Sequence, residues 1–121
     1  MKETINEMCQ QIHSENKRWW VDLKTGEDLS HDQFFVPAKL MLVVSEIAEA
    51  VEGHRKGLMD DKLPHRPAVE VELADAVIRI FDLAGGFKMD LGGAIAEKLM
   101  YNRTRHDHTN EHRQAQGGKA Y

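Results

Sequence analysis

Two segments of this chain combine an apolar helical pattern with a pair of carboxylates. The first, "SEIAEAVEG", carries Glu46 and Glu49, and the second, "VELADAVIR", carries Glu72 and Asp75. Both pairs have i, i+3 spacing, which places the two side chains on one edge of an α-helix, about 60° apart. Each helix must bury its apolar stripe, so the spacing predicts that the acids lie at the border between core and solvent.

The apolar stripes beside these acids recur at steps of three and four residues. They comprise Leu40, Val43, Val44, Ile47 and Val51 in the first segment, and Val69, Leu73, Ala76, Ile80 and Leu83 in the second. A short connection favours antiparallel packing, which brings the four carboxylates together. Like charges about 4 Å apart repel by about 1 kcal/mol even in water, so the cluster needs a neutralising partner. Mg²⁺ prefers oxygen ligands, and we expect it there.

The remaining sequence predicts helices and almost no strand. The expected helices cover residues 3 to about 20, a segment ending at about 56, residues 67 to about 83, and residues 91 to about 105. Gly57 is the expected stop of the second helix and Asp90 the expected cap of the last. The second helix begins either at a capping box of Ser30 and Gln33 or with Pro37 in its first position.

These patterns predict an all-α fold, a four-helix bundle in a single domain spanning residues 1–121, with a polar tail from about 106. A domain of this length buries a limited share of its surface, so we expect oligomerisation to complete the bundle. The formal net charge of −4 argues against a nucleic-acid polymer as partner. A single cysteine and the absence of a long apolar run predict a soluble cytoplasmic protein that does not cross a membrane.

Simpler explanations exist for each acidic residue taken alone. A Glu pair at i, i+3 is usually a solvated helix face, and we expect Glu52, Glu70 and Asp82 to be surface charges. Arg79 lies four residues after Asp75, which favours an ion pair within the helix. No Glu-x-x-His motif occurs, which argues against a di-iron site of the ferritin kind.

The C-terminal segment has the opposite charge balance. Residues 98–121 contain five basic and two acidic side chains, whereas residues 46–82 contain five basic and nine acidic ones. An acidic metal site facing a basic arm suits a polyphosphate ligand. A basic terminal helix that only keeps the chain in solution explains these numbers equally well.

In these features the chain resembles the MazG-like members of the all-alpha nucleoside triphosphate pyrophosphohydrolases, especially their compact bacterial and phage versions. "EIAE" and "ELAD", separated by 22 residues, resemble the family's Glu-x-x-Glu and Glu-x-x-Asp motifs. The similarity extends through "HRKGLMDDKLPHR" and "IRIFDLAG" to "KLMYNRTRHDH". The family's closing "HGGK" is "QGGK" here, with Gln116 in place of histidine.

The resemblance implies Mg²⁺-dependent hydrolysis of a (deoxy)nucleoside triphosphate between the α and β phosphates, with Mn²⁺ as a substitute metal. The products are the nucleoside monophosphate and pyrophosphate. The resemblance also implies a homodimer or homotetramer. The alternative is a non-catalytic helical interaction module with a metal-stabilised acidic surface.

The same resemblance suggests roles for individual residues. The expected metal ligands are Glu46, Glu49, Glu72 and Asp75. Either Glu46 or Glu49 also orients the attacking water. The expected phosphate-binding residues are Lys98, Asn102 and Arg105. The adjacent Trp19 and Trp20 are the expected aromatic platform for the base, because stacking on an aromatic ring tolerates any base. At least one of the two is expected to be a core residue, and we assign base binding to Trp20.

Overall fold

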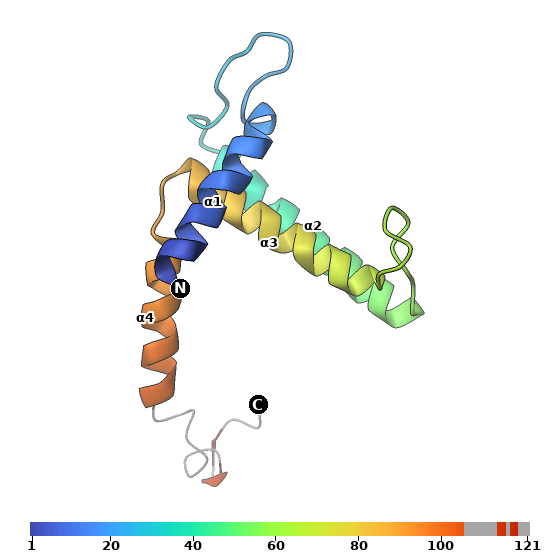
Figure 1. The fold of residues 1–121 in the computed structure, drawn as a ribbon, viewed down its shortest axis with the longest axis vertical. Coiled ribbons are helices and arrows are strands. Elements are labelled where there is room, and N and C mark those ends of the chain that lie inside the picture. Colours follow the sequence, from blue (N-terminus) through green and yellow to red (C-terminus); the bar gives the residue numbers. More distant parts are fainter. Residues whose placement is uncertain (106–113, 116, 119–121) are drawn as a thin grey trace. The chain divides into compact units, whose positions relative to one another are not determined.

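The computed structural model describes residues 1–105, 114–115 and 117–118, and this part of the chain is α-helical (Figure 1). Its elements are α1 (Lys2–Asn16), the short 3₁₀ helix η1 (Lys17–Trp20), α2 (Phe35–Lys56), α3 (Ala68–Gly86) and α4 (Leu91–Thr104). The expected all-α class and the four helices are confirmed. Within the described ranges, extended pairing is limited to two isolated bridges, Val21 with Asp28 and Met59 with Pro67. No described helix is long and apolar enough to span a membrane.

The chain divides into two units. The larger, Glu7–Met89, holds most of α1 together with η1, α2 and α3. The smaller combines Met1–Asn6 with the described residues from Asp90 onward and holds α4.

Helices α2 and α3 lie side by side and form the main packing of the larger unit (Figure 1). The predicted stop of α2 is confirmed, because Gly57 adopts a left-handed conformation with φ 62° and ψ 36°. The Leu58 N–H donates to the Gly53 carbonyl at 3.0 Å and the Gly57 N–H to the His54 carbonyl at 3.3 Å. These bonds complete a Schellman motif, which satisfies carbonyls that the end of the helix would otherwise leave unpaired.

Both predicted starts of α2 are wrong. The helix begins at Phe35, where no side chain caps the first turn. The Ser30 hydroxyl donates to Asp28 Oδ1 at 2.6 Å instead of closing a capping box. Pro37 is the third residue of the helix, where its missing N–H still costs no intrahelical bond.

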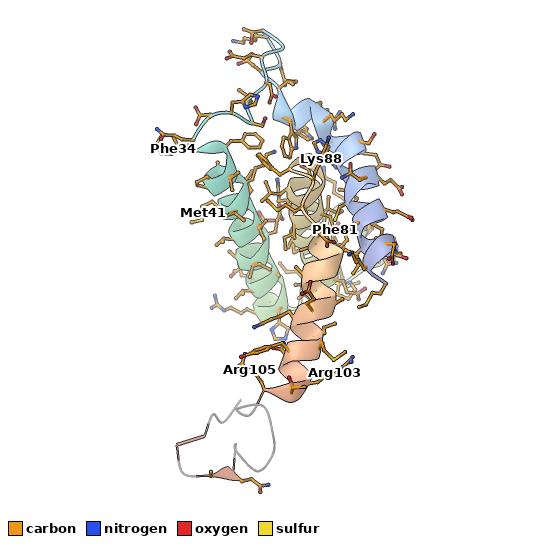
Figure 2. The ribbon with its side chains drawn as sticks, turned by 90° about the vertical axis from the view of Figure 1, so that its left-hand side faces the viewer. Phe34, Met41, Phe81, Lys88, Arg103 and Arg105 are labelled. Atoms are coloured by element: carbon orange, nitrogen blue, oxygen red, sulfur yellow. The ribbon has the colours of Figure 1, made fainter. Side chains whose placement is uncertain are left out.

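Only part of the predicted apolar stripe is buried in this chain. Ala76 and Leu83 are buried as expected. Six other stripe residues expose between 38% and 55% of their surface: Leu40, Val44, Ile47, Val51, Leu73 and Ile80. Phe34 and Met41 also project outward from the α2 side (Figure 2). The hairpin of α2 and α3 therefore leaves much of its apolar surface uncovered by described residues.

The core of the larger unit forms around Trp20 instead. Trp20, Phe35 and Leu83 are buried together, with Val36 packed against them. The Trp20 ring contacts the rings of Phe35 and Phe87, with centroids 4.8 and 5.3 Å away. This cluster joins η1 to the first turn of α2 and the last turn of α3.

Close packing of α1 on the end of α3 leads to a prediction at Gly85. A Cβ on this residue would collide with the backbone carbonyl oxygen of Cys9 and lie 2.9 Å from the His13 Cβ. Helix propensity alone favours Ala over Gly by about 1 kcal/mol. We expect the opposite for Gly85→Ala, a loss of about 1–3 kcal/mol in the free energy of unfolding, because backbone must move. Urea denaturation measures this change, and a gain in stability would contradict the packing.

The smaller unit confirms the predicted cap of the last helix. Asp90 Oδ1 accepts the Gly93 N–H at 2.9 Å. Asn6 ties the N-terminal turn to this cap, since its Nδ2 donates to Asp90 Oδ1 at 2.8 Å and its Oδ1 accepts the Gly92 N–H at 2.8 Å. These bonds explain how two glycines are accommodated in the first turn of α4.

Candidate metal centre

The packing of α2 on α3 brings three of the four predicted carboxylates together. Glu46 projects from α2, and Glu72 and Asp75 project from α3. One oxygen from each lies within 4.8 Å of the others. Glu46 is buried, with 8% of its surface exposed, while Glu72 and Asp75 are half-buried. We call these three residues the acidic triad.

Glu49, the fourth predicted ligand, lies at the rim of the triad. Glu49 is exposed and lies one turn after Glu46 on α2. Its charge nevertheless contributes to the raised pKa values of both Glu72 and Asp75. Glu49 therefore belongs to the same electrostatic cluster but faces solvent.

Burial and mutual repulsion shift the pKa values of the triad. Burial, followed by the neighbouring carboxyls of Glu46 and Glu49, raises the pKa of Glu72 to about 8. Burial and the charge of Glu46 also raise the pKa of Asp75. Burial is also the largest single effect on Glu46 and acts in the same direction, but the bond and charge of Arg79 together with the neighbouring carboxyls outweigh it and lower the pKa of that group. The cluster thus contains more carboxyl groups than the one guanidinium of Arg79 can neutralise.

Two oxygens of the triad have no partner. Glu46 Oε2 and Glu72 Oε2 are buried, and no described group donates a hydrogen bond to them. Buried polar atoms are nearly always hydrogen-bonded, so each exception needs an explanation. A hard divalent cation supplies one, because carboxylate oxygens are its preferred ligands. The residues present therefore fit Mg²⁺.

The raised pKa of Glu72 predicts how the metal-free protein responds to pH. The folded state keeps the Glu72 proton up to about pH 8, whereas an ordinary Glu loses it near 4.5. Between these values the folded state binds more protons, so raising the pH lowers its stability. We expect the melting temperature in EDTA to fall across this window and Glu72→Gln to reduce the fall. Identical pH profiles for the two proteins would contradict the shift.

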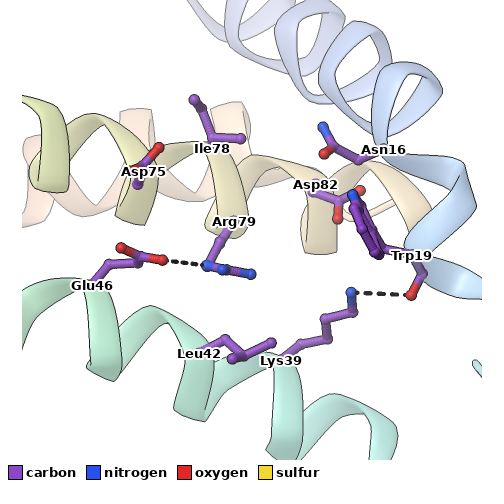
Figure 3. A pocket seen from close by; sticks show the side chains of 9 residues that line it. All are labelled: Asn16, Trp19, Lys39, Leu42, Glu46, Asp75, Ile78, Arg79 and Asp82. Carbon is purple, nitrogen blue, oxygen red and sulfur yellow. Dashed lines mark hydrogen bonds and ion pairs between the residues drawn. The ribbon is translucent and has the colours of Figure 1, made fainter. Parts of the chain in front are cut away.

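The predicted ion pair within α3 is replaced by one between helices. Arg79 Nε donates to Glu46 Oε1 at 2.9 Å, across from α3 to α2 (Figure 3). Its charge also acts on Asp75 and partly offsets the raised pKa of that residue. Spacing within one helix suggested the neighbour but could not reveal the closer acid on the other helix.

Asp82 is not the surface charge that was expected. It is buried, with 7% of its surface exposed. Trp20 Nε1 donates to both of its oxygens, at 3.1 and 3.0 Å, and His13 Nδ1 lies 2.9 Å from Oδ1. The spacing of seven residues from Asp75 placed it on the same face of α3, but the partners on α1 and η1 decide its burial.

A pocket of about 570 Å³ opens beside the triad. Its lining residues are Asn16, Trp19, Lys39, Leu42, Glu46, Asp75, Ile78, Arg79 and Asp82. Glu46 and Asp75 lie at one end, Trp19 and Asn16 at the other, and Arg79 between them (Figure 3). The pocket therefore joins an acidic end to an aromatic end.

Lys39 and Arg79 are two pocket cations to which the sequence analysis assigned no role at a ligand site. Lys39 Nζ donates to the Trp19 carbonyl at 3.4 Å. Burial lowers the pKa of Lys39, and the charge of Asp82 opposes that effect. One signal was available, because Lys39 lies seven residues before Glu46 and Arg79 four residues after Asp75, which places each on the face of its neighbouring acid.

The two adjacent tryptophans differ in exposure, and the buried one is the residue that was expected to bind a base. Trp20, the predicted base-binding residue, is 7% exposed and packs between Phe35 and Phe87. Its indole N–H donates a hydrogen bond to the Asp82 carboxylate. Trp19 is 51% exposed and lines the pocket. The ring accessible to a ligand at this pocket is therefore that of Trp19.

The predicted phosphate-binding residues belong to the smaller unit. Lys98 and Arg105 lie over the Tyr101 ring, with Lys98 Nζ 4.7 Å and the Arg105 guanidinium carbon 5.9 Å from its centroid. Asn102 is half-buried on the same helix. Their role toward phosphate stays a prediction. Gln116 lies outside the described residues, as does most of the tail from 106.

The acidic triad and its pocket are defined by residues of the larger unit alone. Comparison of the chain with protein-family models, with curated proteins and with solved structures finds no match to any of them.

Proposed function

We propose that this chain is a Mg²⁺-dependent nucleoside triphosphate pyrophosphohydrolase. Its substrate is cleaved between the α and β phosphates, giving the monophosphate and pyrophosphate. The observation that carries the proposal is the acidic triad, with two buried unpartnered oxygens, at the end of a pocket that holds two cations and an exposed tryptophan. The resemblance of both motifs to the MazG-like family supplies the reaction.

Glu46, Glu72 and Asp75 would hold the metal, for which Mn²⁺ is the substitute. When bound, Mg²⁺ polarises the phosphoryl oxygens and lowers the pKa of water. Glu49 is the carboxylate best suited to orient the attacking water and accept its proton, because it borders the triad and faces solvent. Glu46 is less suited, since Arg79 occupies one of its oxygens and the other is buried.

The remaining pocket residues suit the rest of a nucleotide. Its phosphates would lie toward the triad, where Arg79 and Lys39 offset their charge. Its base would stack on Trp19, an interaction worth about 1–3 kcal/mol. Leu42 and Ile78 line the pocket as apolar neighbours of the sugar. Lys98 and Asn102 of α4, and Arg105 directly after it, remain the residues that we assign to phosphate through the family resemblance.

A homodimer or homotetramer is part of the proposal. Six stripe residues of α2 and α3 expose 38% to 55% of their surface, and contiguous exposed apolar patches often mark interfaces between subunits. A second copy of the chain would cover this surface and complete the bundle. The same surface also favours the alternative function, a helical interaction module whose acidic residues bind a metal only for stability.

The products of the reaction provide the decisive experiment. A panel of ribo- and deoxyribonucleoside triphosphates with Mg²⁺, separated by chromatography, should give monophosphate and pyrophosphate in equal amounts. Orthophosphate or a diphosphate as the first product would exclude cleavage between the α and β phosphates. A chain that hydrolyses no member of the panel, yet melts at a higher temperature with Mg²⁺, would be the interaction module.

A further inference from the structure

We infer that Arg79 contacts the substrate. In the free protein its guanidinium bonds Glu46, and once a divalent cation binds Glu46 the guanidinium bonds a phosphate oxygen instead. The inference deepens the proposed function and rests on it for the identity of the phosphate. It assigns to one residue a link between cation binding and triphosphate binding.

The first observation is that Arg79 both bonds an acid of the triad and lines the pocket. Its Nε donates to Glu46 Oε1 at 2.9 Å, at the acidic end of the pocket. Its side chain is nevertheless 39% exposed and forms part of the pocket wall between Glu46 and the Trp19 end (Figure 3). Glu46 is its one hydrogen-bond partner among the described residues, so most N–H groups of the guanidinium are available to another acceptor.

The second observation is the charge of the cluster. A single guanidinium, that of Arg79, acts on Glu46 and Asp75 of the acidic triad, and two buried oxygens of the triad stay unpartnered. A divalent cation brings twice the charge and accepts several oxygens at once. Arg79 and such a cation repel each other and share Glu46 as a ligand, so engagement of the carboxylate by the cation weakens the bond to Arg79.

The third observation is what surrounds the released side chain. Arg79 is fixed by its backbone on α3 beside the pocket. Asp82 also lines this pocket, but both of its oxygens already accept the Trp20 indole N–H, so the oxygens of a bound triphosphate would be the acceptors not yet engaged. The planar fork of a guanidinium matches phosphate oxygens with two parallel hydrogen bonds. The exchange therefore replaces a carboxylate by a phosphate and leaves no charge unpaired.

Lys39 supplies a matched control. It is the other cation of the pocket, but it bonds the Trp19 carbonyl and feels the charge of Asp82 rather than that of the triad. Lys39→Gln removes one pocket charge without touching Glu46. It should weaken binding of a polyphosphate and leave binding of a cation to the free protein within about twofold of the wild type.

The test is titration calorimetry on the full chain with two probes, Mn²⁺ alone and inorganic tripolyphosphate in the presence of Mn²⁺. Arg79→Gln should bind Mn²⁺ at least about threefold more tightly than the wild type, because the competing charge is gone. It should bind tripolyphosphate at least about tenfold more weakly. Arg79→Lys keeps the charge but loses the planar fork, so its Mn²⁺ affinity should stay near that of the wild type while tripolyphosphate binding is weakened.

Each contrary result has a separate meaning. Unchanged or weaker Mn²⁺ binding by Arg79→Gln, in a variant whose circular dichroism matches the wild type, would overturn the inference, as would unchanged tripolyphosphate binding or a wild type that binds no Mn²⁺. If Arg79→Gln fails to fold, weakened tripolyphosphate binding by Arg79→Lys still supports the exchange and unchanged binding overturns it. Both expected shifts in a protein that hydrolyses no triphosphate would contradict only the proposed function.

Discussion

Replacing Asp75 by Asn or Glu72 by Gln should reduce turnover of the preferred triphosphate by more than about 100-fold, because each change removes a charged ligand from the acidic triad. Steady-state kinetics at saturating Mg²⁺ measures the loss. The same changes relieve repulsion in the metal-free protein, so its melting temperature in EDTA should stay the same or rise. Loss of activity together with higher metal-free stability separates a functional cluster from a structural one.

Glu49→Gln tests the difference between a ligand and a base. Glu49 is exposed at the rim and does not belong to the triad, so this variant should lose turnover while binding Mn²⁺ within about threefold of the wild type. A loss of Mn²⁺ binding as large as that of Asp75→Asn would show that Glu49 is itself a ligand.

Glu52→Gln is the control for both experiments. Glu52 lies on the same helix but pairs with Arg55 and Lys56, at 3.3 and 2.7 Å. Exposed pairs of this kind contribute about 0–1 kcal/mol, so turnover and stability should change little. Near-normal activity in Asp75→Asn and Glu72→Gln, or an equal loss in Glu52→Gln, would mean that the functional acids lie on another face of α2 and α3.

Trp20→Ala should lower the free energy of unfolding by about 3–5 kcal/mol. The change empties the centre of the core cluster and removes the indole N–H from the buried carboxylate of Asp82. Urea denaturation followed by circular dichroism measures the loss. Trp20→Phe keeps a ring between Phe35 and Phe87 but lacks the N–H donor. Its loss in the free energy of unfolding should be smaller than that of Trp20→Ala and should include the loss of the hydrogen bond to Asp82.

Trp19→Ala is the neighbouring comparison. Trp19 is 51% exposed, and the guanidinium carbon of Arg18 lies over its ring, 4.8 Å from the centroid. Its removal should cost less than about 1 kcal/mol of stability but raise KM for every triphosphate, since the proposed stacking surface is lost. If Trp19→Ala unfolds the protein as readily as Trp20→Ala, the division into a core ring and a pocket ring is wrong.

Much of the fold follows from local patterns in the chain. Gly57 ends α2 and Asp90 caps α4 because both act on backbone groups within a few residues, which sequence spacing specifies directly. The i, i+3 spacing of the acid pairs likewise predicted a shared edge on each helix. Three of the four acids meet because a short connection makes α2 and α3 neighbours.

The contact partner of each of these side chains depends on the tertiary structure. Arg79 bonds Glu46 rather than an acid of its own helix, and Asp82 is buried because His13 and Trp20 approach it from α1 and η1. The two adjacent tryptophans look alike in sequence, yet only the packing of η1 sends Trp20 into the core and Trp19 to the pocket. Spacing along a helix determines which side chains share a face, but a contact between helices depends on their relative position, which no local pattern encodes.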